Sequence, residues 1–250
     1  MLFLVTGASA GFGAEISRVL VSKGHSVIGT ARRKEKLAQL QEELGDKFYP
    51  LCFDISSKEE TKNAINSLPE NLQNIDVLVN NAGLGLGLEP AHSASFEDWE
   101  KMINTNVLGL CYMTHLILPQ MVARKFGLII NMGSIAGTYP YPGGNVYGAT
   151  KAFTKQFSLN LRADLAGTGV RVCNIEPGLC GETEFSHVRF KGDTEKVNAL
   201  YNDVDFIQPI DIANIVSWVS EQPQHVNINA IEVMPTAQSF SALNVVKNNE

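Results

Sequence analysis

Short runs of apolar residues alternate along the chain with longer segments in which apolar residues recur at helical spacing. Residues 2–5 form the first apolar run, which is continuous and ends at a glycine-rich turn. A continuous run of this length is typical of a strand that is buried on both faces. In the next segment Phe12, Ile16 and Leu20 share one helical face, and Gly24 suits the left-handed position just past a helix end. The opening of the chain therefore predicts a buried strand followed by a helix.

The same alternation continues along the rest of the chain. Further strands are expected at residues 26–30, 49–53, 75–79, 128–132, 170–175 and 228–233, and further helices at 34–44, 58–68, 96–124, 145–166 and 210–221. Neighbouring parallel strands need crossover connections, which these helices supply. The pattern predicts the doubly wound α/β class, a Rossmann-type fold with seven parallel strands and helices on both faces of the sheet.

No linker rich in Pro, Gly or Ser divides the chain and no internal repeat is present, so residues 1–250 are expected to form one domain. One segment breaks the alternation, because residues 179–208 are polar and interrupted. Loops of that length within a compact domain are usually functional. Ligands of this fold class bind beyond the carboxyl ends of the strands, where the insertion begins. We expect the insertion to cover the substrate; a plain surface excursion is the alternative.

The composition is that of an ordinary soluble globular protein, with 44% hydrophobic and 18% charged residues. The formal net charge of −6 disfavours a nucleic acid or an anionic membrane as the partner and leaves small molecules as the expected ligands. The start of the chain lacks the basic segment of a secretory signal, and no apolar run approaches the roughly 18 residues of a membrane span.

The four cysteines, Cys52, Cys111, Cys173 and Cys180, stand in apolar surroundings without C-x-x-C or metal-site spacing. We expect buried free thiols, as in a reducing compartment, and therefore a cytoplasmic protein. No metal site is predicted.

A glycine-rich turn at residues 6–13, TGASAGFG, joins the first strand to the first helix. Glycines at this position let the backbone approach a pyrophosphate, and the helix N-terminus offers unpaired N–H groups. The spacing is G-x3-G-x-G and lacks the Lys-Ser/Thr ending of a P-loop, which disfavours a nucleoside triphosphatase. The turn predicts dinucleotide binding, and a glycine-rich turn without a ligand is the alternative.

Two arginines, Arg32 and Arg33, follow the second strand where an acidic residue would usually meet a free ribose 2′-hydroxyl. Guanidinium groups fit a 2′-phosphate, which carries nearly two charges and accepts forked hydrogen bonds. The pair favours NADP over NAD. Glu35 nearby could still bind the ribose hydroxyl of NAD, so NAD stays an alternative cofactor. A solvated basic turn that binds no ligand is the other alternative.

Two further polar positions follow predicted strands. Asp54 comes after the third strand, and Asn81-Ala82-Gly83 comes after the fourth. At the carboxyl ends of parallel strands these residues would lie where an adenine and a ribose bind. As isolated residues they would be ordinary turn formers.

Tyr147 and Lys151 are four residues apart on a predicted helix, so their side chains share one face, and Ser134 ends the preceding strand. A phenol with a pKa of about 10 needs roughly 4 kcal/mol of preferential phenolate stabilisation to reach a pKa of about 7. A nearby ammonium and a hydroxyl donor can supply it. Tyr147 would then exchange a proton with the substrate oxygen while hydride moves between the substrate carbon and the nicotinamide. Asn106, within a helix, is expected to hold a water that links Lys151 to solvent.

Over essentially its whole length the chain resembles the short-chain dehydrogenase/reductase family. The resemblance rests on the TG-x3-G-x-G turn, Asn80-Asn81-Ala82-Gly83, the Tyr147-x3-Lys151 pair with Asn106 and Ser134, and Pro177-Gly178. It implies a catalytic tetrad of Asn106, Ser134, Tyr147 and Lys151, with a homotetrameric assembly. The expected contacts of NADP are Gly7, Ser9, Ala10, Gly11, Phe12, Gly13, Arg32, Arg33, Asp54, Ile55, Asn81, Ala82, Gly83, Tyr147, Lys151, Pro177, Gly178 and Thr183.

The stretches GGNVYGATKAF, EPGL, TEFSHVRFKGD and HVNINAIEVMP resemble the bacterial NADP-dependent 3-hydroxy acid dehydrogenases, a subgroup that includes malonic semialdehyde reductases and serine or L-allo-threonine dehydrogenases. The resemblance implies reversible oxidation of a short 3-hydroxy acid. The sequence after the Pro-Gly turn, Cys180-Gly181-Glu182, departs from the pattern and puts the local geometry of the insertion in doubt. A reductase of other carbonyls, such as 3-oxoacyl thioesters, and a dinucleotide sensor without turnover are the alternatives.

A small carboxylate substrate requires a cation or a set of N–H donors near the nicotinamide. Arg189, in the insertion, is the candidate, and it joins Ser134 and Tyr147 in the expected substrate site; an ordinary surface arginine is the alternative. His115 and His187 have no visible carboxylate partner in the sequence, so packed or exposed histidines are expected there rather than acid–base groups.

Overall fold

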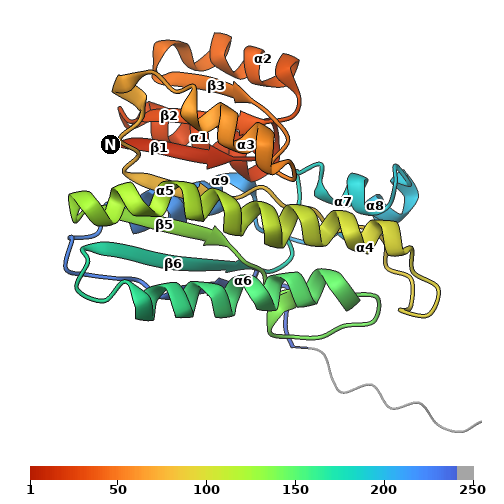
Figure 1. The fold of residues 1–250 in the computed structure, drawn as a ribbon. Coiled ribbons are helices and arrows are strands. Elements are labelled where there is room, and N and C mark those ends of the chain that lie inside the picture. The colour runs from red at the N-terminus through yellow and green to blue at the C-terminus, as the bar shows by residue number, and fades with distance from the viewer. Residues whose placement is uncertain (241–250) are drawn as a thin grey trace, which may run out of the picture.

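The computed structural model describes residues 1–240. It contains a seven-stranded parallel sheet in the order β3-β2-β1-β4-β5-β6-β7, which confirms the predicted fold class (Figure 1). The strands are β1 (Leu2–Thr6), β2 (Ser26–Ala31), β3 (Phe48–Cys52), β4 (Val77–Asn80), β5 (Gly127–Met132), β6 (Val170–Pro177) and β7 (Ala230–Val233). The direction in which successive strands are added reverses between β1 and β4. The turns that follow these two strands therefore lead to opposite sides of the sheet and leave a crevice at the carboxyl ends of the strands.

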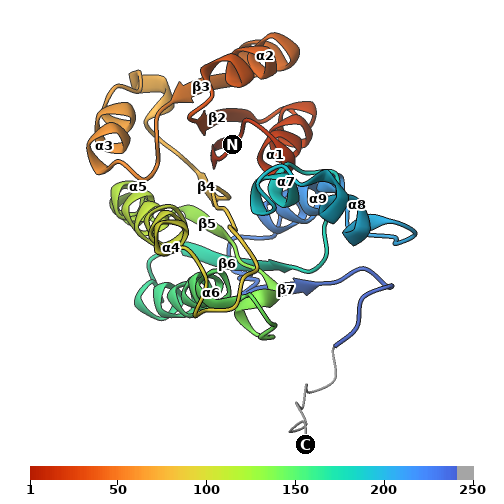
Figure 2. The same cartoon turned by 90° about the vertical axis from the view of Figure 1, so that its right-hand side faces the viewer.

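Helices cover both faces of the sheet (Figure 2). One face carries α1 (Gly11–Ser22), α2 (Lys34–Leu44) and α9 (Pro209–Ser220), and the other carries α3 (Lys58–Asn66), α5 (Leu110–Arg124) and α6 (Asn145–Asp164). The alternation of side chains along β1 explains this division, because successive residues of a strand point to opposite faces. Phe3 and Val5 join the core beneath α1 and α9, whereas Leu2 and Leu4 join the core beneath α5.

The helix predicted at residues 96–124 is divided. It consists of α4 (Phe96–Ile103), a π-helical turn (Asn104–Gly109) and α5. Apolar periodicity does not reveal such a turn, because the helix continues in nearly the same direction on both sides of it (Figure 1). The wider turn carries Asn106, one of the predicted site residues.

By length and composition alone, the 29-residue segment Phe96–Arg124 is apolar enough to cross a membrane, with a mean hydropathy of 1.2 in its most apolar window. This differs from the expectation that no segment approaches a membrane span. Met113, Ile117 and Met121 of this segment are fully buried against the sheet. Part of the apolar surface of this segment is thus used to pack against the sheet.

The insertion at residues 179–208 contains two helices that sequence periodicity did not indicate, α7 (Phe185–Arg189) and α8 (Thr194–Tyr201). Both lie beyond the carboxyl ends of the strands (Figure 1), and residues of both line a small cavity together with residues of α1. This is the edge where ligands of the fold class bind. Its role as a substrate cover, and the single-domain division of the chain, remain predictions.

The four cysteines are free, but they do not share one environment. Cys173 is buried, and Cys111 and Cys180 are partly buried, whereas Cys52 is exposed. The expectation of four buried thiols is therefore wrong at Cys52. Cys52 is the last residue of β3, which is the edge strand of the sheet and has a neighbouring strand on one side only.

Candidate functional site

The site begins where β1 and β4 end, at the buried side chain of Thr6. The Thr6 hydroxyl accepts hydrogen bonds from the backbone N–H groups of Asn81, at 3.0 Å, and Ala82, at 2.9 Å. The Asn81 side chain donates in return to the Thr6 carbonyl, at 2.8 Å. These contacts hold the turn after β1 against the turn after β4. Thr6 opens the predicted glycine-rich turn, but it was not among the predicted site residues, because the motif does not show that its hydroxyl reaches the turn after β4.

The glycine turn has the backbone geometry that an anion site needs. Gly7 and Gly11 have positive φ angles of 70° and 51°, and a Cβ atom on Gly13 would lie 2.3 Å from the Gly7 carbonyl oxygen. Within residues 1–240, no side chain caps the start of α1, and the first turn of this helix holds no acidic residue. The first N–H groups of α1 are thus available to a negatively charged group. This arrangement fits the pyrophosphate of a dinucleotide.

A cavity of about 760 Å³ runs from the glycine turn to Tyr147. Every predicted cofactor contact lines it except Gly13, which lies behind the turn and allows close packing there. The predicted substrate residues Ser134, Tyr147 and Arg189 also line it, whereas Asn106 does not. The structure therefore brings nearly all of the predicted site to one cavity of the size that binds cofactors.

The two arginines predicted to favour NADP both reach this cavity, and each is paired with a carboxylate. Arg32 lies 3.6 Å from Asp54, and Arg33 lies 2.7 Å from Glu184 of the insertion. Arg33 also donates from Nε and Nη2 to the Ser9 hydroxyl, at 3.3 and 3.0 Å. The cavity thus has a cationic end next to the glycine turn.

At the other end of the cavity lie Ser134, Tyr147 and Lys151. Ser134 follows β5, accepts a hydrogen bond from the Ala136 N–H and donates to the Pro177 carbonyl at 3.4 Å. Tyr147 and Lys151 lie one turn apart on α6, and the Lys151 ammonium nitrogen is 5.8 Å from the centre of the Tyr147 ring. The three predicted catalytic side chains thus meet as their spacing indicated.

Burial shifts the two titratable groups in opposite directions. Desolvation raises the pKa of Tyr147 to about 12, although the neighbouring Ser134 hydroxyl and the Arg189 charge act to lower it. Desolvation also lowers the pKa of Lys151 to about 8. The expected acidified phenol is therefore not a property of the chain by itself. One reason is that the Lys151 amine donates to the Met132 carbonyl, at 2.8 Å.

Asn106 lies beneath the cavity wall rather than in it. Its amide exchanges two hydrogen bonds with the Leu84 backbone, at 2.9 and 2.8 Å, and donates to the Thr150 hydroxyl at 3.1 Å. These bonds join the segment after β4 to α6. The expected water that links Lys151 to solvent thus remains a prediction, since the hydrogen bonds of Asn106 go to Leu84 and Thr150.

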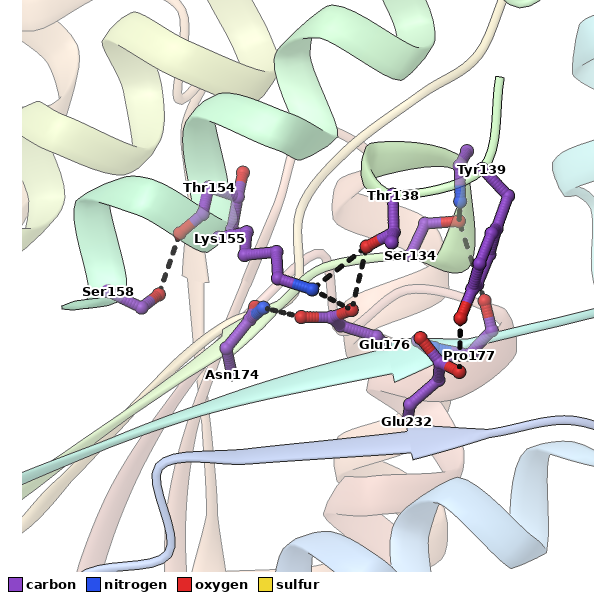
Figure 3. A network of polar contacts seen from close by, with 11 residues as sticks. Ser134, Thr138, Tyr139, Thr154, Lys155, Ser158, Asn174, Glu176, Pro177 and Glu232 are labelled. Atoms are coloured by element: carbon purple, nitrogen blue, oxygen red, sulfur yellow. Dashed lines mark hydrogen bonds and ion pairs between the residues drawn. The ribbon is translucent and has the colours of Figure 1, made fainter. Parts of the chain in front are cut away.

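A buried carboxylate, Glu176, supports the same end of the cavity from below (Figure 3). It accepts hydrogen bonds from the Asn174 amide at 2.7 Å, from Lys155 at 3.1 Å and from the Thr138 hydroxyl at 3.4 Å. Lys155 lies one turn beyond Lys151 on α6, and Thr138 follows the turn of Ser134. Glu176 therefore connects β6, α6 and the turn after β5. This network was not predicted, since its members are scattered along the sequence and match no motif.

Arg189 lies over the ring of Tyr147, with its guanidinium carbon 5.1 Å from the ring centre. Its Nη2 donates to the Tyr141 hydroxyl at 2.5 Å, and its Nε donates to the Gly87 carbonyl at 3.4 Å. Arg189 forms no ion pair with any residue among positions 1–240. A cation without a counter-ion beside the phenol is a place where an anionic ligand can bind. Tyr141, which positions it, was missed in the sequence.

Neither histidine weighed above belongs to this cavity. His115 stacks on Tyr112, with ring centres 6.4 Å apart, on the outer side of α5. His187 lines a separate cavity of about 530 Å³ behind the glycine turn. Both positions agree with packed or exposed histidines rather than acid–base groups.

The comparisons with known proteins agree with this geometry. A family model described as short chain dehydrogenase matches residues 2–194. The chain belongs to the short-chain dehydrogenase family. This confirms the resemblance that the motifs carried, and it accounts for the seven-stranded sheet and the glycine turn found at its switch point.

Two curated relatives and one solved structure are similar over nearly the whole chain. A probable NADP-dependent dehydrogenase of Haemophilus influenzae is 62% identical, with 98% of this chain and 97% of the relative covered. The NADP-dependent 3-hydroxy acid dehydrogenase YdfG of Escherichia coli strain K12 is 57% identical, with 98% and 99% covered. The closed form of a serine dehydrogenase complexed with NADP+ has a TM-score of 0.98 at 56% identity, and 99% and 100% of the two chains are covered.

We expect Thr6→Val to destabilise the protein by about 2–4 kcal/mol, because it removes the acceptor of two buried N–H groups. The free energy of unfolding in urea measures this, and NADPH affinity should fall in the same variant. Thr6→Ser keeps the hydroxyl and should stay closer to the wild type. A Thr6→Val protein as stable as the wild type would contradict the role given to the hydroxyl.

The lowered pKa of Lys151 predicts a pH dependence of stability. The unfolded chain keeps this proton up to the ordinary pKa of 10.5, whereas the folded chain loses it near pH 8, so stability rises with pH between these values. Relative to Lys151→Met, the wild type should gain about 2 kcal/mol in the free energy of unfolding between pH 8 and pH 10. The raised pKa of Tyr147 acts only above pH 10, where it lowers stability.

Lys62→Met, at an exposed position on α3, is the matched control and should keep the dependence of the wild type. If the free energy of unfolding varied with pH in the same way in the wild type and in Lys151→Met, the Lys151 amine would not be buried as described.

Proposed function

We propose that this chain is an NADP-dependent dehydrogenase that transfers hydride between the nicotinamide and a short 3-hydroxy acid. The observation that carries the proposal is the meeting of Ser134, Tyr147 and Lys151 with Arg189 in one cavity that also opens onto the glycine turn. A 3-hydroxy acid has a hydroxyl to be deprotonated and a carboxylate to be held. The cavity presents a phenol and a cation side by side, at the distances that a small molecule spans.

The cofactor is NADP, and it supplies the hydride acceptor or donor when bound. The glycine turn and the start of α1 would hold its pyrophosphate, and Ser9, Arg32 and Arg33 its 2′-phosphate. The acidic alternative, Glu35, lies in the first turn of α2 and is exposed, and it does not line the cavity. The two guanidinium groups that line the cavity thus favour NADP over NAD.

In the oxidation of the substrate, Tyr147 takes the proton of the substrate hydroxyl as the carbon loses hydride, and in the reduction it returns the proton. Ser134 donates a hydrogen bond to the substrate oxygen. Lys151 stabilises the phenolate by its charge. Since the pKa of Tyr147 starts at about 12, bringing it to about 7 needs roughly 7 kcal/mol of phenolate stabilisation, more than the sequence argument assumed. Turning the Lys151 amine from the Met132 carbonyl toward the phenol supplies part of it.

In this proposal Arg189 binds the carboxylate of the substrate. In a three-carbon 3-hydroxy acid the carboxylate is only two carbon–carbon bonds from the reacting carbon, so both groups must bind close to Tyr147. Arg189 lies over the Tyr147 ring and is steadied by Tyr141 and Phe185, with its guanidinium carbon 5.5 and 5.9 Å from their ring centres. This placement favours short acids over 3-oxoacyl thioesters, which carry no charge at that position.

Two further expectations belong to the same proposal. A homotetramer is supported by apolar side chains that the single chain leaves exposed on outer helices, at Leu108, Phe153, Leu159 and Trp218. A cytoplasmic location is supported by the free cysteines, since reducing compartments keep thiols unpaired.

Tyr147→Phe should lower kcat for serine or 3-hydroxypropionate oxidation by about 10²- to 10⁴-fold, because the proton acceptor is lost. NADPH formation measures kcat, and a fluorescence titration should show NADPH affinity within about twofold of the wild type. Tyr49→Phe, on the edge strand β3, is the control. A Tyr147→Phe enzyme with unchanged turnover would exclude the proton role. If the wild type binds NADPH but turns over no carbonyl or alcohol, the sensor alternative holds.

Arg189→Met should lower kcat/KM for 3-hydroxypropionate by about 10- to 100-fold, the worth of a charge-assisted hydrogen bond. For the methyl ester of 3-hydroxypropionate, which has the same reacting carbon and no charge, kcat/KM should change less than about threefold in the same variant. Lys196→Met, also in the insertion, is the control. Equal losses for acid and ester would show that Arg189 does not bind the carboxylate, and faster turnover of 3-oxoacyl thioesters by the wild type would favour the other reductase class.

A further inference from the structure

The arginine assigned to the 2′-phosphate already holds an anion of the protein itself. Glu184 Oε2 lies 2.7 Å from Arg33 Nη1. Glu184 belongs to the insertion and immediately precedes α7, so it is far from Arg33 in the chain. Its side chain borders the cofactor cavity on one side and the smaller cavity behind the glycine turn on the other. The pair therefore closes the cationic end of the cavity with a carboxylate.

Arg33 does not need Glu184 for its orientation. The guanidinium also donates from Nε and Nη2 to the Ser9 hydroxyl, so its other edge is held by the glycine turn. Loss of Glu184 would leave Arg33 directed at the same place with one partner fewer. This decides whether Glu184 helps or hinders binding of the 2′-phosphate. If Glu184 were needed to orient Arg33, it would strengthen phosphate binding. Because Ser9 already orients Arg33, Glu184 only competes with the phosphate and weakens its binding.

The neighbouring cation offers no substitute. Arg32 is more exposed than Arg33 and lies at 3.6 Å from Asp54, a longer pairing. Arg33 is thus the better oriented of the two cations, and it is the one to which Glu184 is paired. A carboxylate and a phosphate both prefer the fork of a guanidinium, and they repel each other when they share it.

We propose that Glu184 is a specificity-determining residue that occupies Arg33 in place of the 2′-phosphate and so limits the preference for NADP over NAD. The inference rests on the assignment of Arg33 to the 2′-phosphate in the proposed function. To reach Arg33, the 2′-phosphate of NADP must displace the Glu184 carboxylate or share the guanidinium with it. NADP therefore binds more tightly when Glu184 loses its charge. NAD presents only a hydroxyl there and has no charge with which to compete, so its affinity is nearly independent of Glu184.

The pair also couples this choice to the insertion. Within residues 1–240, two ion pairs join residues 179–208 to the rest of the chain, Arg33–Glu184 and Lys191–Asp98, the latter at 2.9 Å. Displacement of Glu184 releases one of them. The identity of the anion at Arg33 therefore alters how the insertion is held over the cavity.

The test is an equilibrium titration of Glu184→Gln with NADPH and with NADH, followed by nucleotide fluorescence and without substrate. Glutamine keeps the size of the side chain and removes its charge. NADPH should bind about three- to tenfold more tightly than to the wild type, as expected for loss of a half-exposed charge pair and of its repulsion. NADH should change less than about twofold, and the gain for NADPH should shrink as salt is added.

Three variants make the result specific. Glu182→Gln removes a charge of the same insertion that forms no ion pair in the described part of the chain, and it should change neither affinity. Arg33→Ala should weaken NADPH more than NADH, and adding Glu184→Gln to Arg33→Ala should give no further gain. A weaker NADPH affinity in Glu184→Gln, an equal gain for both nucleotides, or a gain that persists without Arg33 would each overturn the proposal. If Arg33→Ala itself leaves the preference for NADPH intact, the assignment of Arg33 in the proposed function fails instead.

Discussion

The hydroxyl of Thr6 is the contact on which the site depends. In a parallel sheet the switch point between β1 and β4 would otherwise leave two turns facing each other with unpaired backbone groups. The Thr6 oxygen accepts the N–H groups of both Asn81 and Ala82, and thereby aligns the glycine turn with the residues that follow β4. The cavity exists because these two turns neither collapse onto each other nor separate. Asn106 and Glu176 extend the same support to α6 and to the turn after β5.

The chemistry of the site follows from burial as much as from the identity of its residues. Desolvation disfavours the charged form of each group, so the folded chain raises the pKa of Tyr147 and lowers that of Lys151. Each shift opposes the phenolate–ammonium pair that proton transfer requires. Near neutral pH the Tyr147 phenol is uncharged, whereas Lys151, with a pKa of about 8, is still mostly protonated. The phenolate is therefore the charge that the surroundings have to stabilise, and the hydrogen bond of Lys151 to Met132 is the one to be exchanged.

Much of this could be predicted from the sequence because its signals are local. The bounds of α2 were predicted to the residue, since Leu37, Leu40 and Leu44 recur at helical spacing between a strand and Gly45. The glycine turn and the Tyr147–Lys151 pair were found for the same reason, because each lies within a few residues. The contacts Thr6–Asn81, Thr138–Glu176 and Tyr141–Arg189 join residues 38 to 75 positions apart, and no spacing rule marks them. The direction of the Tyr147 pKa shift depends on burial, which no motif encodes.

The π-helical turn at Asn104–Gly109 has a consequence for how the chain tolerates changes in length. A π turn holds about one residue more than a turn of α-helix, so loss of one residue here would leave an α-helical turn, with α4 and α5 in nearly the same relative orientation. Met102, which is fully buried, would stay on the inner side of α4, and Phe96 would stay on its exposed side. The same loss within α4 or α5 would instead rotate one part of the helix against the other by about 100°. Shortening the wide turn would thus spare the packing of the helix but disturb the polar anchor that Asn106 makes to Leu84.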